Sequence, residues 1–181
     1  MAKEELFKNY YQNVERRFTI LHLEIRKFDF FDWISLSLFA VSVSIDLILI
    51  SETKSKFISS LFISGIIANF ILATPFGIRF RNFYFSIIWF ILSLIFLLNS
   101  TSFSKLPLLL FILYHILRLF FWKAYKKEFI PYSAGRGKLY RYVSKIEGRG
   151  GYKEDRMYMI IMILLGFVLF MYCLLESVGN S

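Results

Sequence analysis

Apolar residues in this chain occur in five long runs that are separated by short polar segments. The runs cover residues 30–50, 57–77, 83–99, 106–122 and 157–175. Each approaches the roughly 20 residues that a helix needs to cross the hydrocarbon core of a bilayer, although the third and fourth runs are shorter than the others. Long runs with so few charges are typical of membrane spans rather than of a large soluble core. The pattern therefore predicts an all-α integral membrane protein with about five transmembrane helices.

A heptad pattern precedes the first run, in residues 4–28. Its apolar stripe consists of Phe7, Tyr11, Val14, Phe18, Leu21, Ile25 and Phe28. The opposite face is charged and polar, so this segment is expected to form an amphipathic helix. Most stripe positions are aromatic, whereas a dimeric coiled coil prefers Leu and β-branched residues. The stripe therefore favours the membrane interface or the groove of a partner protein over a self-paired coil, and packing against the basic segment after the fourth run is a third interpretation.

That basic segment contains a stretch, 133–151, that is rich in glycine, arginine and lysine. It is not a phosphate-binding loop, because Leu139 follows the Gly-Lys pair and Tyr132 stands where the first glycine is required. A single Arg-Gly-Gly also gives little support to nucleic-acid binding. Residues 138–147 show helical spacing of apolar positions, which predicts a short amphipathic helix between glycine breakers. Its surroundings supply candidates for contact with anionic headgroups or a partner protein: Arg136, Lys138, Arg141 and Lys145.

Charge along the chain predicts how the spans are oriented. The net charge is +9, and most basic residues lie before the first run, after the second and after the fourth. The segments on the other side contain only Lys54, Lys56 and Lys105. By the positive-inside rule, the N-terminus lies in the cytoplasm and the C-terminus outside, and we expect a bacterial inner-membrane protein. Its parts are an amphipathic helix (1–29), four transmembrane helices (30–122), a basic cytoplasmic loop (123–156), a fifth transmembrane helix (157–177) and an external tail (178–181).

The overall composition agrees with this architecture. Hydrophobic residues make up 57% of the chain and the mean hydropathy is +0.56, whereas soluble domains are about 45–50% apolar. The charged N-terminus lacks a signal-peptide pattern, so we expect the first span to act as an uncleaved insertion signal. The single cysteine, Cys173, excludes an internal disulfide and a thiolate metal cluster.

Polar residues inside the spans are candidates for function, because ionisable groups are costly at membrane depth. Asp46 lies near the outer end of the first span, where it can reach the interface or pair with one of the three outer lysines. His115 and Arg118 share a face of the fourth span. Arg118 can extend toward the interface, and His115 can hydrogen-bond to another helix, for example to Asn69 of the second span. A structural interpretation competes in each case with a proton-handling or substrate site. Two acids at span ends are expected to be solvated: Asp32 and Glu176.

Small residues at a spacing of three or four also suggest how the first two spans pack. Such residues let helix backbones approach closely in a membrane. They form one face on each helix, Ser37, Ala40 and Ser44 on the first and Ser60, Ser64 and Ala68 on the second. We therefore expect these two helices to contact each other, or to meet other protomers through these faces.

Catalytic motifs are absent from the sequence. His22 and His115 lack metal-binding spacing, no GxSxG elbow occurs, and no acids pair at a metal-binding spacing. An enzyme is therefore disfavoured, and neither a cofactor nor a metal is expected. We expect a non-enzymatic interaction or assembly subunit of a membrane complex, acting on a protein partner or as a homo-oligomer through its N-terminal helix and basic loop. The alternative is a pore-forming effector or small channel or transporter built by oligomerisation, with Asn69, His115 and Arg118 near its path.

Overall fold

The computed structural model describes residues 23–25, 27–48, 53–131, 143–144, 149–150 and 153–179. Most of this part is helical, in α2 (Phe30–Ile48), α3 (Thr53–Ala73), α4 (Phe83–Leu97), α5 (Leu106–Tyr125) and α6 (Lys153–Gly179). Two short 3-10 helices, η1 (Pro75–Arg81) and η2 (Ser102–Lys105), precede α4 and α5. A small antiparallel strand pair, β1 (Val143–Ser144) and β2 (Arg149–Gly150), lies between α5 and α6 in the sequence.

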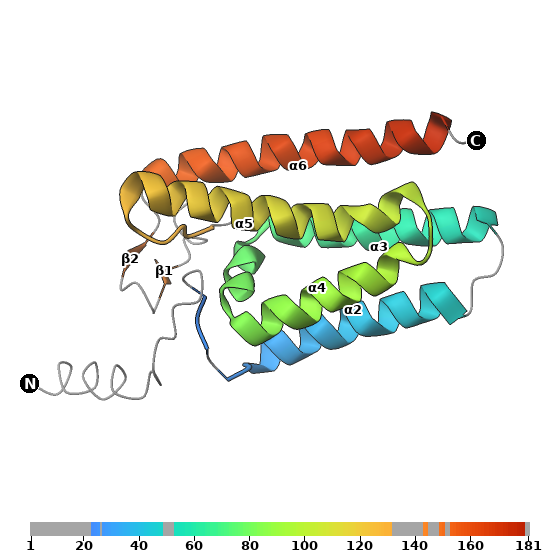
Figure 1. The fold of residues 1–181 in the computed structure, drawn as a ribbon, viewed down its shortest axis with the longest axis horizontal. Coiled ribbons are helices and arrows are strands. Elements are labelled where there is room, and N and C mark those ends of the chain that lie inside the picture. Colours follow the sequence, from blue (N-terminus) through green and yellow to red (C-terminus); the bar gives the residue numbers. More distant parts are fainter. Residues whose placement is uncertain are drawn as a thin grey trace, which may run out of the picture.

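The helices lie side by side and successive helices run in opposite directions (Figure 1). α2 packs on α4, α5 packs on α6, and α3 contacts η1, α5 and α6. The start of α2, the η1 turn and the strand pair all lie toward the same end of the bundle, together with the last residues of α5. We name this end the basic end, because it holds Arg79, Arg81, Lys123, Lys126 and Lys127. The other end, where α4 connects to α5, is the opposite end.

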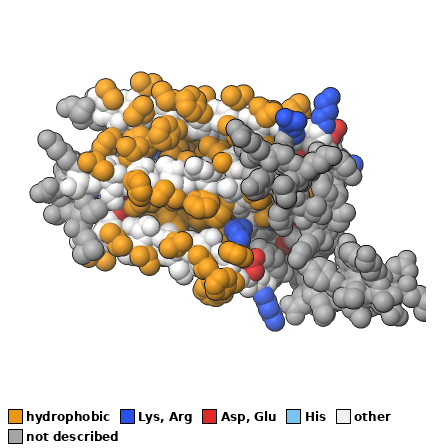
Figure 2. Space-filling view, turned by 180° about the vertical axis from the view of Figure 1, so that it is seen from behind, with side chains coloured by type: hydrophobic (Ala, Val, Ile, Leu, Met, Phe, Trp, Pro, Cys, Tyr) orange, Lys and Arg blue, Asp and Glu red, His pale blue; other side chains and the backbone are white. Residues whose placement is uncertain are grey.

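Within the described residues, four helical stretches are long and apolar enough to cross a membrane: Phe30–Ile48, Ser55–Ala73, Ser102–Tyr125 and Lys153–Gly179. α4 is apolar too but has only 15 residues, or about 22 Å at ~1.5 Å per residue. Many large apolar side chains point outward, and they cover the flank of the bundle (Figure 2). An outer surface of this kind is suited to lipid. The structure therefore confirms an all-helical protein with several candidate membrane spans, apart from the small strand pair.

Local sequence explains where several helices start and end. Thr74 and Asn82 cap η1 and α4, because each side chain accepts a hydrogen bond from the backbone N–H two residues later. Lys126 ends α5, since its backbone is left-handed with φ of 54° and its N–H donates to the carbonyl of Trp122 at 2.8 Å. These caps fix the two turns that carry the basic residues of the basic end.

Aromatic side chains fill the space between α2, η1, α4 and α5. Phe80 of η1 is fully buried, and its ring centroid lies between 5.1 and 5.9 Å from those of Phe85, Trp89, Phe111 and Tyr114. Phe39 of α2 packs on Trp89 at 4.5 Å. The tilted and edge-on arrangements are those that aromatic rings favour. At this end of the bundle, the core is therefore centred on a side chain of the 3-10 helix η1 and not on a contact between two long helices.

The predicted N-terminal helix does not extend to Phe28. Residues 23–25 and 27–29 are not helical, and Glu24 forms a parallel β-bridge with Asn82. Two backbone hydrogen bonds hold this bridge, from Glu24 N to the Arg81 carbonyl and from Phe83 N to the Glu24 carbonyl. The heptad pattern did not reveal this competing partner for the backbone. The rest of the predicted helix, with Phe7, Tyr11, Val14, Phe18 and Leu21, lies outside the described residues.

The predicted helix over 138–147 is also wrong where the structure describes it. Val143 pairs with Gly150 and Ser144 pairs with Arg149, so these residues form antiparallel strands. Glycines after residue 147 favour a chain reversal, and β-branched Val143 suits a strand. Apolar spacing over only ten residues did not distinguish these two outcomes. The four lipid-contact candidates, Arg136, Lys138, Arg141 and Lys145, lie outside the described residues.

The first two spans, α2 and α3, contact each other as predicted, but the predicted small face is buried only on α3. Ser60, Ser64 and Ala68 of α3 are buried, but Ser37 and Ser44 of α2 are exposed. α2 instead turns Leu36, Phe39 and Val43 inward, and Phe39 contacts α4. The contact between α2 and α3 is therefore made without the exposed serines of α2, and it includes the hydrogen bond from Ser60 to Asp46.

Candidate functional site

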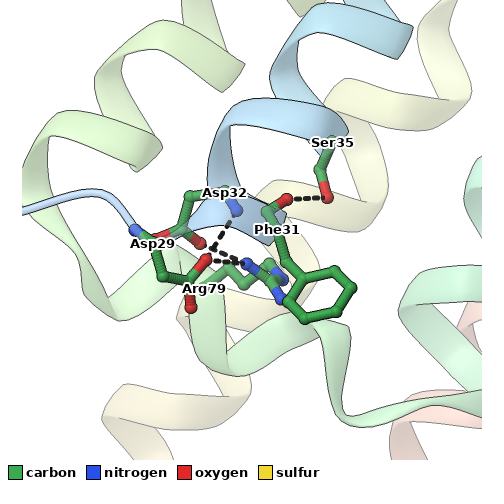
Figure 3. Close-up of polar contacts among 5 residues, drawn as sticks. All are labelled: Asp29, Phe31, Asp32, Ser35 and Arg79. Carbon is green, nitrogen blue, oxygen red and sulfur yellow. Dashed lines mark hydrogen bonds and ion pairs between the residues drawn. The ribbon is translucent and has the colours of Figure 1, made fainter.

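Arg79 joins two aspartates at the start of α2, at the basic end (Figure 3). Its Nη1 lies 3.0 Å from Asp29 Oδ1 and also contacts Asp32 Oδ1. Asp29 and Asp32 bond each other's backbone N–H groups at 2.7 and 3.0 Å, which forms a reciprocal cap on α2. The guanidinium also stacks near the rings of Phe31 and Phe76. Asp32 is fully buried, so the expectation that it is solvated is wrong.

Arg81, two residues further along η1, holds the segment before α2. Its Nη2 pairs with Glu24 Oε1, and the Arg81 side chain is almost fully buried. The same Glu24 makes the backbone bridge to Asn82, so side chain and backbone fix it together. Charged pairs desolvated in this way are costly to break. The chain preceding residue 24 therefore starts from a fixed point on the bundle.

Arg118 is buried inside the basic end of α5. Its Nε donates to Glu128 Oε2 at 2.9 Å, and Nη2 lies 3.5 Å from Oε1. Because only 2% of Arg118 is exposed, its predicted extension toward the interface is wrong. Asp155 of α6 is also buried and accepts a hydrogen bond from the backbone of Ile130 at 2.9 Å. Through Glu128 and Asp155, the segment that follows α5 is held against the place where α5 and α6 pack together.

His115 lies one turn before Arg118 among aromatic rings. Its centroid is 4.5 Å from Phe111 and 6.2 Å from Phe80, and its buried Nε2 has no hydrogen-bond partner among the described residues. Asn69 is exposed on α3, and none of the described contacts of His115 involves it. The suggested Asn69–His115 bond is therefore not formed in the described part of the chain. The alternative that His115 and Arg118 handle protons or substrate stays a prediction.

Asp46 of α2 lies in a polar cluster at the opposite end. It is fully buried, and its Oδ2 accepts hydrogen bonds from Ser60 Oγ, at 3.2 Å, and from Asn99 Nδ2. Asn99 Nδ2 also contacts Ser60 Oγ at 2.6 Å. The burial of Asp46 contradicts the expected contact with the interface. Asp46 forms no ion pair with the described lysines Lys56 and Lys105, of which Lys105 pairs with Glu176 instead, and the side chain of Lys54 lies outside the described residues. Asp46 thus joins α2 to α3 and to the turn after α4.

Two further contacts complete the opposite end. The half-buried Lys105–Glu176 pair joins η2 to α6. Ser64 of α3 donates to the backbone carbonyl of Phe103 at 2.7 Å, and both residues are buried. The small-residue face of α3 therefore packs on η2, which lets a serine hydroxyl reach a backbone carbonyl. Polar bonds of this kind supplement van der Waals packing between membrane helices.

Several important polar residues were missed or misjudged from the sequence. In the sequence, Arg79 and Arg81 stand out only as basic residues that indicate membrane orientation, and Asn99 only as the last residue of an apolar run. The spacing of Asp29 and Asp32, three residues apart at the start of an apolar run, resembles a reciprocal cap and was the available signal. No comparable pattern indicates Asn99 or Glu128, because both lie in connecting segments and neither is spaced regularly from its partner on a helix.

The polar side chains described at both ends of the bundle form ion pairs and hydrogen bonds. The described part of the chain contains no cluster of three His, Cys, Asp or Glu side chains able to hold a metal ion. No protein-family model matches the chain, and neither a curated protein nor a solved structure is significantly similar to it. Function must therefore be inferred from the arrangement of the bundle and its two polar ends.

Proposed function

We propose that all five helices α2 to α6 cross the membrane, with the basic end in the cytoplasm and the end of α6 outside. The alternating direction of the helices supports this proposal, since each polar connection then lies at a bilayer surface (Figure 1). The short α4 is extended by η1 before it and by a turn after it. A bilayer also accommodates a short hydrophobic segment by local thinning, at modest cost. The excess of basic residues at the basic end agrees with the positive-inside rule.

In this membrane the chain is proposed to act as a non-enzymatic interaction or assembly subunit of a larger complex. The observation that carries the proposal is the attachment of Glu24 to the η1–α4 junction by a backbone bridge and the Arg81 ion pair. Glu24 is thus held at the η1–α4 junction, and we propose that the apolar stripe that precedes it in the sequence is presented from this attachment point. An amphipathic stripe presented from a fixed point can dock in the groove of a partner protein. The nearby basic residues are proposed to face anionic headgroups.

The polar side chains of the bundle support this proposal more than a pore. Arg118 and Asp46 are buried and make their bonds within the protomer. A pore built by oligomerisation needs polar groups facing a shared path, and Asn69 is the exposed member of the candidate set. The pore stays as the alternative proposal, which a homo-oligomer that leaks ions from liposomes would support.

Purification of the native complex from mild detergent tests the interaction proposal. Serine replaces Phe7, Tyr11 and Phe18 in a stripe variant, and Lys8, Gln12 and Thr19 in a control variant of the opposite face. We expect a stoichiometric partner with the wild type and the control, and its loss from the stripe variant. A charge swap tests the fixed attachment: Glu24→Arg should lower recovery of the partner, and adding Arg81→Glu should restore it. Equal recovery from all variants would contradict the proposal.

A further inference from the structure

The polar cluster at the opposite end contains a carboxylate, that of Asp46, for which the described residues supply no positively charged partner. Asp46 is fully buried, and its two partners, Ser60 and Asn99, are neutral. It forms no ion pair with any described residue, while Lys105 of η2 pairs with Glu176 of α6. The other charge described on the neighbouring helix is half-buried Lys56 of α3. A lone carboxylate buried in a membrane protein is strongly unfavourable. Asp46 differs in this respect from Asp29 and Asp32 at the basic end, which both pair with Arg79.

Hydrogen bonding inside the cluster leaves two oxygen atoms unused. Asn99 Nδ2 donates to Asp46 Oδ2 and to Ser60 Oγ. Asp46 Oδ1 and Asn99 Oδ1 are buried and accept no hydrogen bond from the described residues. Asn99 is only 6% exposed. Both unused atoms are acceptors, so they cannot satisfy each other, and they belong to two side chains that already share a hydrogen bond.

A single small cation would neutralise the charge of Asp46 and would also give the two unpaired oxygen atoms a partner. We propose that Asp46 and Asn99, assisted by Ser60, form a site for a single monovalent cation, either a proton or Na⁺. A proton added at Oδ1 converts the carboxylate to a neutral acid, which becomes a donor toward the amide oxygen of Asn99. Na⁺ would instead be bound by the oxygen atoms of the three side chains, which are hard ligands. Because the cluster has a single carboxylate, it does not suit a divalent ion.

This site connects three elements of the bundle. Asp46 comes from α2, Ser60 from α3, and Asn99 from the turn between α4 and η2. The cation thus neutralises charge at a point where these elements meet. The inference does not depend on the proposed interaction function, because it concerns the opposite end of the molecule from the N-terminal segment. Loss of a partner protein would leave it unchanged.

Infrared spectroscopy of the full chain in lipid nanodiscs, with ¹³C-labelled aspartate, tests for the proton. The chain has four aspartates, Asp29, Asp32, Asp46 and Asp155, so the label reports on few groups. If the cation is a proton, the wild type at pH 7 shows the carbonyl band of a protonated acid. Asp46→Asn abolishes that band, whereas the control Asp29→Asn, at an aspartate whose side chain is half exposed, keeps it. The wild-type spectrum remains informative even if a variant fails to fold.

A sodium titration tests the other cation. If Na⁺ occupies the site, the protonated-acid band is absent and the melting temperature rises with NaCl but not with choline chloride. Asp46→Asn and Asn99→Leu should abolish that rise, and Lys105→Met should keep it. The proposal is overturned if the wild type shows neither the acid band nor a sodium-dependent melting temperature, or if the band is present and unchanged in folded Asp46→Asn protein.

Discussion

Gly77 stands where η1 packs against α5, and the space for a side chain is already filled. A Cβ atom at this position would lie 2.6 Å from Cε2 and 2.8 Å from Cδ2 of Tyr114. Tyr114 is fully buried among other rings, so it has little freedom to move aside. In α3, by contrast, a Cβ atom on Gly65 would meet nothing within 4 Å. The two glycines therefore make a matched pair for substitution.

Gly77→Ala should destabilise the bundle by about 1–3 kcal/mol, the usual cost of overpacking a well-packed core. Gly65→Ala should leave stability unchanged or raise it by roughly 0.5–1 kcal/mol, since alanine is preferred within helices. Thermal unfolding in detergent measures both variants against the wild type. Equal melting temperatures for the two variants would show that the close contact between η1 and α5 is not as described.

The fate of single polar residues could be predicted only in part from the sequence. Asp46 and Arg118 were correctly singled out as polar groups within apolar runs, but their partners were not. Asn99 and Glu128 occupy turns, where polar residues are common and carry no periodic signal. Each becomes a partner only when the chain folds back on the bundle. The sequence pattern indicates that a buried charge needs a partner. Which residue becomes that partner depends on how the chain folds in three dimensions.

The ion pairs that connect elements of the bundle differ in burial, and this difference predicts how much each contributes to stability. Arg79 ties η1 to the capped start of α2, and its partner Asp32 is fully buried. Lys105 ties η2 to α6, and its side chain is 42% exposed. Ion pairs at exposed sites contribute about 0–1 kcal/mol, whereas breaking a buried pair costs about 3–5 kcal/mol.

Arg79→Met should therefore lower the melting temperature clearly more than Lys105→Met does. Methionine keeps much of the apolar volume of both side chains, so the comparison isolates the charge and its hydrogen bonds. Thermal unfolding of the two variants in the same detergent gives the measurement. A Lys105→Met effect equal to or larger than that of Arg79→Met would contradict the assignment of Arg79 as the main tie between η1 and α2.

Among the secondary-structure elements, the sequence predicts the long helices well and the short elements poorly. The apolar runs at 57–77 and 106–122 correspond closely to α3 and α5, because a long uninterrupted run leaves few alternatives to a helix. The run at 57–77 still conceals the end of α3 and the start of η1 at Thr74 and Pro75. Glu24 and Val143 pair with distant or neighbouring backbone instead of continuing a helix. Such pairing depends on tertiary contacts that apolar spacing does not record.

For the whole molecule, the number of membrane crossings depends on whether α4 crosses the membrane. If α4 crosses the membrane, both polar ends lie at bilayer surfaces and the termini are on opposite sides. If it does not, the chain crosses four times, and everything after α4 changes sides. The buried Phe39–Trp89 contact places α4 beside α2, a predicted span, and supports the first arrangement. Alternating basic loops agree with it as well.

Cysteine labelling in intact cells tests this topology directly. In a Cys173→Ala background, Ser100→Cys reports on the turn after α4, and Lys127→Cys reports on the turn after α5; both positions are exposed. With five spans and a cytoplasmic basic end, a membrane-impermeant maleimide should label Ser100→Cys in intact cells and Lys127→Cys only after permeabilisation. Labelling of Lys127→Cys in intact cells, with Ser100→Cys protected until permeabilisation, would contradict the arrangement of five spans with a cytoplasmic basic end.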